Sequence, residues 1–176
     1  KAVISNFSTN KTAVLSKTLP VIIFFLIFCA SCKIFYTENA KNSIQNEYKL
    51  RKELVELSEQ YIGTKYKYGG ISPKTGFDCS GFTKYIFNQK NIILPHSSQA
   101  QSKLGKKIKL KNVKQGDLIF FKNRRKIDHV GIVVSITKNH LIILHSTTSA
   151  GVKKDYIYTS KYWKKKITFA NDVISQ

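Results

Sequence analysis

The feature that most restricts the fold of this chain is a change of hydrophobic pattern, from helical spacing in its first half to short strand-like runs in its second. From Glu47 onward, Leu50, Leu54, Leu57 and Tyr61 recur at helical spacing, which predicts an amphipathic helix. Beyond residue 105 the apolar residues come in short runs between turn residues, as in strands. The expected strands cover residues 107–110, 117–121, 129–135, 141–145 and 163–170. Helices followed by an antiparallel meander predict an α+β fold, with helices packed on one antiparallel sheet.

Two further helices are predicted from their capping residues. Asp78 is a good N-cap for a helix that runs to about Asn88, because its carboxylate can accept from the first unpaired backbone N–H groups. Leu94-Pro95 interrupts the chain, and Ser97 or Ser98 can cap a short helix that ends near Gly105. The first residue of the longer helix is Cys79, so a thiol is expected at a helix N-terminus.

The first 31 residues have the composition of an export signal. Residues 1–18 are polar and cationic, residues 19–28 are continuously apolar, and small residues follow. The apolar block is shorter than the ~20 residues that span a bilayer, so a signal is favoured over a retained anchor helix. We therefore expect residues 1–31 to direct export and to be absent from the ordered domain.

Cys29-Ala30-Ser31-Cys32 resembles a lipoprotein cleavage site, with Cys32 as the lipidated residue. A redox Cys-x-x-Cys is the other interpretation, but that motif belongs near a βαβ unit. We expect a membrane-anchored protein of the cell envelope, with plain secretion as the second alternative. Residues 32–46 would form a polar tether, and residues 47–176 the ordered domain.

Charge and cysteine content limit the partners of the domain. The chain has 30 Lys and Arg against 10 Asp and Glu, a net charge of +20. Nucleic acid is the usual partner of such a surface, but an exported protein is expected to meet anionic wall polymers and phospholipid instead. Scattered lysines on solvated faces also need no partner at all. Cys79 is the single cysteine after Cys32, which excludes a disulfide framework and suggests chemistry.

Cys79 and His129 are the candidate nucleophile and general base. A helix N-terminus and a neighbouring imidazolium would both lower the thiol pKa and favour the reactive thiolate. His129 begins an apolar run, so it is expected at the rim of a core strand. The alternatives are a buried, inert cysteine and a structural histidine.

His145 ends the following strand, which is expected to pair with the strand of His129 as a hairpin. A third polar group that orients the base is what such a pair requires. His96 and His140 are weaker candidates because of their positions after a proline and in a turn. A Cys/His metal site is disfavoured, because no two of these ligands share a short loop.

The sequence resembles the NlpC/P60 family of papain-like cell-wall cysteine peptidases. The most specific matching block is Phe77-Asp78-Cys79-Ser80-Gly81-Phe82, and Asp128-His129-Val130-Gly131-Ile132 is another. All six matching blocks follow the order of the family and cover residues 63–70, 77–82, 94–99, 115–121, 128–132 and 145–147.

The resemblance implies a role for several residues. Cys79 would be the nucleophile, His129 the base and His145 the residue that orients it. Tyr66 would lie near the thiol and assist the oxyanion, whereas Asp78 and Ser80 would contact the substrate peptide.

Two positions depart from the family pattern near the expected cleft. Tyr68 stands where Trp is common, and His96 stands where Arg is common. The preference among stem peptides is therefore left open. Asp117, before an apolar strand, is expected to bond local backbone rather than substrate.

The expected enzyme requires no metal or organic cofactor, and we expect it to be a monomer. Its expected reaction is hydrolysis of an amide bond in the peptidoglycan stem peptide, between γ-D-glutamate and the diamino acid. The alternatives are an amidase or acyltransferase with a non-wall substrate, and a non-catalytic wall-binding lipoprotein.

Overall fold

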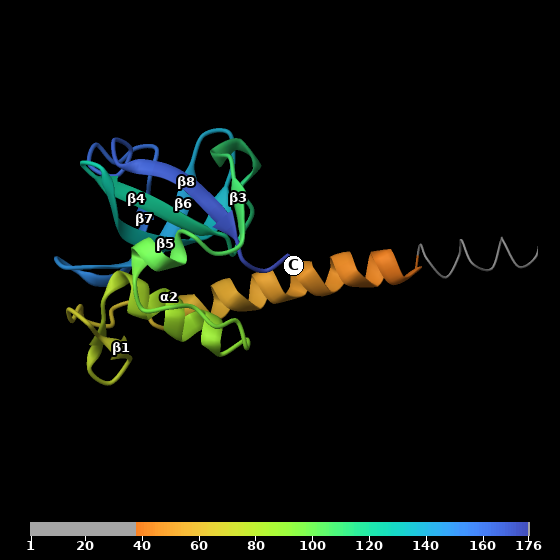
Figure 1. Ribbon diagram of the computed structural model, residues 1–176, viewed down its shortest axis with the longest axis horizontal. Coiled ribbons are helices and arrows are strands. Elements are labelled where there is room, and N and C mark those ends of the chain that lie inside the picture. The colour runs from red at the N-terminus through yellow and green to blue at the C-terminus, as the bar shows by residue number, and fades with distance from the viewer. Residues whose placement is uncertain (1–37, 176) are drawn as a thin grey trace, which may run out of the picture. The chain divides into compact units, whose positions relative to one another are not determined.

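The computed structural model describes residues 38–175 of the chain (Figure 1). It divides into two units, residues 1–46 and 47–176. Of the first unit, residues 38–46 are helical and all exposed. A helix with no buried face need show no hydrophobic periodicity, so the sequence of this segment predicted only a polar tether. Among the described residues, no helix is both long and apolar enough to cross a membrane.

The second unit is built on a six-stranded antiparallel sheet in the order β3-β8-β4-β5-β6-β7 (Figure 1). Its strands are β3 Lys106–Ile108, β4 Leu118–Asn123, β5 Lys126–Ile136, β6 Leu141–Thr147, β7 Gly151–Tyr156 and β8 Ile167–Asp172. A two-stranded hairpin, β1 Ile71–Ser72 and β2 Gly76–Phe77, lies outside this sheet, and a 3-10 turn covers Leu110–Asn112. The α+β prediction is confirmed.

β7 and the start of β8 differ most from the sequence prediction, while β5 begins at Lys126 rather than at His129, and the hairpin of β1 and β2 was also not predicted. β7 was not expected, because Lys153, Lys154 and Asp155 give it no apolar alternation and it lies at an edge of the sheet. β8 begins at Ile167 rather than at Trp163, since residues 161–166 form turns.

Helices α2 and α3 begin after the capping residues that the sequence indicated. Residues 47–59 are helical, and α2 covers Cys79–Asn88 with Asp78 as its N-cap. The Asp78 carboxylate accepts from the Gly81 backbone N–H at 2.6 Å. Helix α3, Ser98–Gln101, is capped by Ser97 and ends before the expected Gly105.

The sheet is covered by hydrophobic clusters formed by alternate residues of its strands. On β4, Phe120 belongs to the cluster that contains Phe82 and Ile86 of α2, whereas Phe121 belongs to the other cluster, with Ile143 of β6. All five side chains are fully buried. Burial on both sides explains why β4 to β6 are apolar runs rather than alternating ones.

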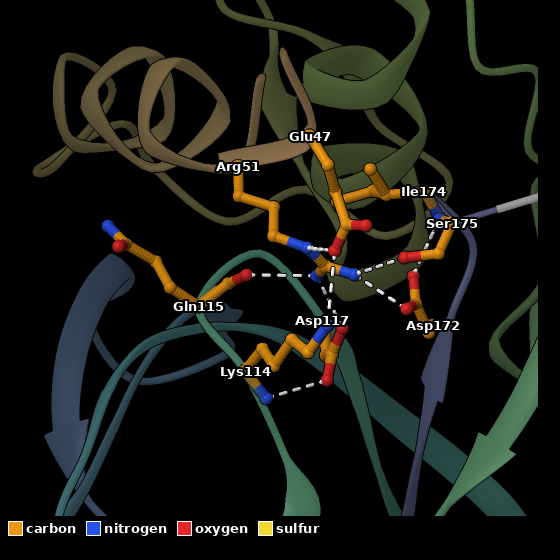
Figure 2. A network of polar contacts seen from close by, with 8 residues as sticks. All are labelled: Glu47, Arg51, Lys114, Gln115, Asp117, Asp172, Ile174 and Ser175. Atoms are coloured by element: carbon orange, nitrogen blue, oxygen red, sulfur yellow. Dashed lines mark hydrogen bonds and ion pairs between the residues drawn. The ribbon is translucent and has the colours of Figure 1, made fainter. Parts of the chain in front are cut away.

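A buried arginine connects the helix of residues 47–59 to two strands (Figure 2). The Arg51 guanidinium donates to Asp117 Oδ1 at 2.7 Å, just before β4, and to Asp172 Oδ2 at 2.6 Å, at the end of β8. Its Nε donates to Glu47 at 2.7 Å. Asp117 also accepts from the Lys114 backbone N–H at 2.8 Å, the local contact that the sequence predicted. Arg51 as its buried ionic partner was not predicted.

Candidate active site

Close backbone packing fixes the position of Cys79 at the start of α2. The Asp78 backbone N–H donates to the Gly70 carbonyl at 3.0 Å, which ties the preceding loop to the helix. A Cβ added at Gly81 would lie 1.9 Å from that carbonyl oxygen, so only glycine fits there. The Cys79 Sγ lies 4.0 Å from the Asp128 carbonyl oxygen, which brings the thiol to the strand that carries His129.

Burial reverses the expected effect of the helix N-terminus on the thiol. It raises the pKa of Cys79 to about 11, although backbone hydrogen bonds from Val130 and Ser80 favour the thiolate. The nearby Asp78 carboxylate raises the pKa further. The expectation of a lowered thiol pKa is therefore corrected: removal from water outweighs the backbone donors.

His129 and His145 are hydrogen-bonded to each other. His129 lies on β5 and His145 on the adjacent strand β6, with His129 Nε2 and His145 Nδ1 2.9 Å apart. Gly131 leaves the space for this contact, because a Cβ there would lie 3.2 Å from the His145 Cβ and 2.9 Å from Ile143 Cδ1. The hairpin that the sequence predicted thus places the second histidine directly behind the first.

Both histidines are neutral in this environment. Burial lowers the pKa of His129 well below its usual value, and the nearby Lys166 ammonium and the adjacent His145 imidazole also disfavour its protonated form. Burial also lowers the pKa of His145, against the effect of Asp155. A neutral imidazole beside a protonated thiol is the state from which His129 could accept the thiol proton.

One cavity of about 350 Å³ contains the candidate nucleophile and base. Its lining includes Tyr66, Cys79, His129, Thr148, Ser149, Lys153, Asp155, Tyr162, Trp163 and Lys166. His145 is fully buried behind His129 and does not line the cavity. The pocket is polar enough, and large enough, for a short peptide segment to lie over the thiol.

Asp78 and Ser80 are not part of this lining. Asp78 Oδ2 contacts His96 Nε2 at 2.9 Å and accepts from the Gly69 backbone N–H at 3.0 Å. Ser80 Oγ donates to the other Asp78 oxygen at 3.0 Å. Both residues therefore organise the loop and the helix start around the thiol. His140, in contrast, lies in a turn and contacts only Thr137 within it.

Two residues of the site were missed from the sequence. Asp155 Oδ2 lies 2.9 Å from His145 Nε2 and accepts from Trp163 Nε1 at 3.0 Å. The Trp163 indole stacks on the His129 ring at 4.6 Å, with 24° between the planes. Neither residue lies in a recognisable motif, so the contacts follow only from the fold. Cys32 lies outside the described residues, and within residues 38–175 no cluster of His, Cys, Asp and Glu is suited to hold a metal ion.

Comparison with known proteins matches the same region. The Gamma-DL-glutamyl hydrolase of Bacillus subtilis is 37% identical over 118 residues, which cover 65% of this chain and 27% of that protein. A probable endopeptidase of Haemophilus influenzae is 36% identical over 149 residues, 79% of this chain and 87% of the relative. The chain thus spans about a quarter of the first relative and most of the second.

A solved structure and a family model agree with these relatives. The NlpC/p60 domain of the peptidoglycan hydrolase SagA superposes with a TM-score of 0.59 at 30% identity, covering 69% of this chain and 97% of that domain. The model of the NlpC/P60 family matches residues 63–171, which contain the thiol, both histidines, Asp155 and Trp163. This protein belongs to the NlpC/P60 family.

Proposed function

We propose that the protein is a peptidoglycan endopeptidase that uses Cys79 as its nucleophile and His129 as its general base. The observation that carries the proposal is that both residues line one cavity, with His129 hydrogen-bonded to the buried His145 at 2.9 Å. The named activities of the similar proteins, an endopeptidase and a peptidoglycan hydrolase, support the same reaction class.

The proposed reaction begins from a neutral thiol and a neutral imidazole. His129 accepts the thiol proton while Sγ of Cys79 attacks the amide carbonyl, and the carbonyl oxygen becomes an oxyanion. Burial raises the pKa of Tyr66, so its hydroxyl stays protonated and can donate to that oxyanion. The imidazolium then gives its proton to the leaving amine, and the carbon–nitrogen bond breaks to leave a thioester.

Hydrolysis of the thioester completes the cycle. Water enters the position of the departed amine, and His129 removes one of its protons as the oxygen attacks the thioester carbon. The carbon–sulfur bond then breaks, the imidazolium returns its proton to the Cys79 sulfur, and the carboxylic acid product loses its proton to solvent. His145 orients the imidazole through both half-reactions. Only the residues of this chain and water take part in these steps.

The scissile bond that we propose joins the γ-carboxyl of D-glutamate to the diamino acid of the stem peptide. The name of the Bacillus subtilis relative, a Gamma-DL-glutamyl hydrolase, supports a γ-glutamyl bond. Asp78, Ser80 and His96 would act on the peptide indirectly, since they shape the loop over α2 rather than the cavity wall.

Mass analysis of digested wall material tests the proposal. Purified peptidoglycan is incubated with the protein and, as a control, with Cys79→Ala. The proposal predicts new fragments with a free diamino-acid amine and matching fragments that end in D-glutamate, from the wild type alone. Fragments from another bond would overturn the bond assignment, and no cleavage by the wild type would overturn the function.

We further propose that the chain is a monomeric lipoprotein of the cell envelope, anchored through Cys32 after removal of residues 1–31. The apolar block of residues 19–28 followed by Ala30-Ser31-Cys32 supports this anchor. Labelling of cells with a radioactive fatty acid would place the label on the wild-type protein and not on Cys32→Ala. Equal labelling of the two proteins would overturn the anchor.

A further inference from the structure

A continuous line of polar contacts extends from the cavity into the protein behind the thiol. His129 Nε2 meets His145 Nδ1 at 2.9 Å, and His145 Nε2 meets Asp155 Oδ2 at 2.9 Å. These three residues lie on the adjacent strands β5, β6 and β7. Because each contact uses one defined ring nitrogen, the line fixes where every proton must lie.

The assignment of protons starts at Asp155. Although burial opposes it, hydrogen bonds from His145 and Lys153 lower the pKa of Asp155 to about 2, so the carboxylate is ionised and can only accept. His145 Nε2 must therefore carry a proton. Since His145 is neutral, its Nδ1 has a lone pair and accepts from His129.

The tautomer of His145 in turn determines that of His129. Its Nε2 must donate to His145, so a neutral His129 has its lone pair on Nδ1. Nδ1 is the ring nitrogen that this contact leaves for the thiol proton. The opposite tautomer would place a proton on Nδ1 and leave no base for Cys79.

We propose that Asp155 is a positioning residue of the thiol site, which selects the productive tautomers of His145 and His129 through its contact with His145 Nε2. The proposal rests on the function proposed above and extends it to a residue two contacts away from His129. Asp155 also lines the cavity, but its proposed role acts through His145 and not through contact with the reacting atoms.

Trp163 holds this arrangement in place. Its Nε1 donates to the same Asp155 oxygen at 3.0 Å, while its ring stacks on His129 and lies 4.8 Å from the His145 ring. The indole thus covers both imidazoles and directs the carboxylate oxygen toward them. The other oxygen of Asp155 pairs with Lys153 at 2.9 Å. A purely structural ion pair is therefore the alternative role of this carboxylate.

The test separates these two roles by comparing Asp155→Asn and Asp155→Ala with Lys153→Met. The Lys153 variant removes the ion pair but retains the contact with His145. Nitrogen-15 NMR of the histidine rings at neutral pH reports the tautomers, and hydrolysis of a γ-D-glutamyl peptide reports kcat and KM. Thermal unfolding shows whether each variant is folded. If Asp155→Ala does not fold, the comparison is made with the near-isosteric Asp155→Asn.

In the wild type we expect His129 and His145 to be protonated at Nε2 alone. The Asp155 variants should show mixed tautomers and a kcat about 10–100-fold lower with KM within about twofold, because the wrong tautomer removes the base rather than the binding site. Lys153→Met should keep the wild-type tautomers, and the tautomers alone are its readout because Lys153 lines the cavity.

Wild-type tautomers in a folded Asp155 variant would overturn the proposal, as would unchanged kcat despite altered tautomers. The NMR result does not depend on peptide hydrolysis. If the wild type cleaved no wall peptide, the function proposed above would fail while the tautomers would still decide the role of Asp155.

Discussion

Replacement of Arg51 by methionine should destabilise the domain strongly. Arg51 is 4% exposed, and its partners Asp117 and Asp172 are 1% and 6% exposed. Methionine fills much of the same volume but leaves both carboxylates buried without their cation. Removal of one member of a buried ionic group costs about 3–5 kcal/mol, because the remaining charge has lost both water and its partner.

For a domain of this size that loss lowers the melting temperature by roughly 10–20 °C. Urea unfolding followed by circular dichroism measures the free energy of unfolding directly. Lys52→Met is the matched control, since Lys52 is the next residue on the same helix and pairs with Glu56 at 3.6 Å with both side chains more than half exposed. We expect that control to change stability by less than about 0.5 kcal/mol.

The destabilisation caused by Arg51→Met should depend on pH. The unpaired carboxylates of Arg51→Met should have raised pKa values, so their penalty is present at neutral pH and decreases as they become protonated on acidification. The stability difference between variant and wild type should therefore narrow from pH 7 to pH 5. A loss below about 1 kcal/mol at pH 7, or a difference that widens on acidification, would refute the reasoning.

Three further predictions concern the site. Burial raises the pKa of Cys79 and lowers that of His129, so the rate of Cys79 alkylation by iodoacetamide should rise roughly tenfold per pH unit from pH 7 to pH 9. An alkylation rate that reaches a plateau below pH 7 would instead indicate a preformed thiolate–imidazolium pair. Gly81→Ala should cost about 1–3 kcal/mol in urea unfolding and lower activity, since its Cβ would lie 1.9 Å from the Gly70 oxygen; wild-type stability would contradict the close approach. The lowered pKa of Asp155, about 2, means that its stabilising contribution is present above about pH 4 and lost toward pH 2, so the melting temperatures of wild type and Asp155→Ala should converge over that range.

The sequence predicted those parts of the site that depend on residues close to each other in the chain. Asp78 was identified as the N-cap of the helix that starts at Cys79, because capping is decided within four residues. His129 and His145 were assigned to paired strands from their apolar neighbours. Their atomic contact could not be derived, because the register shift between Val133 and Ser135 sets which residues lie opposite each other.

The remaining parts depend on tertiary packing and had no local signal. Asp155 lies on a charged edge strand and Trp163 in a turn, so neither hydrophobic pattern nor motif marks them. The fold can bury Arg51 because two segments distant in sequence place Asp117 and Asp172 beside its guanidinium. The raised pKa of Cys79 was predicted with the wrong sign, because the sequence shows the helix N-terminus but not how much water the fold removes.

Alkylation of Cys79 with activity measured in parallel tests the central claim most directly. The protein is treated with iodoacetamide for increasing times, peptide mapping gives the fraction modified at Cys79, and muropeptide release gives the remaining activity. We expect activity to fall in proportion to that fraction and to vanish at complete modification. Undiminished muropeptide release from protein that is fully alkylated at Cys79 would contradict the assignment of this thiol as the nucleophile.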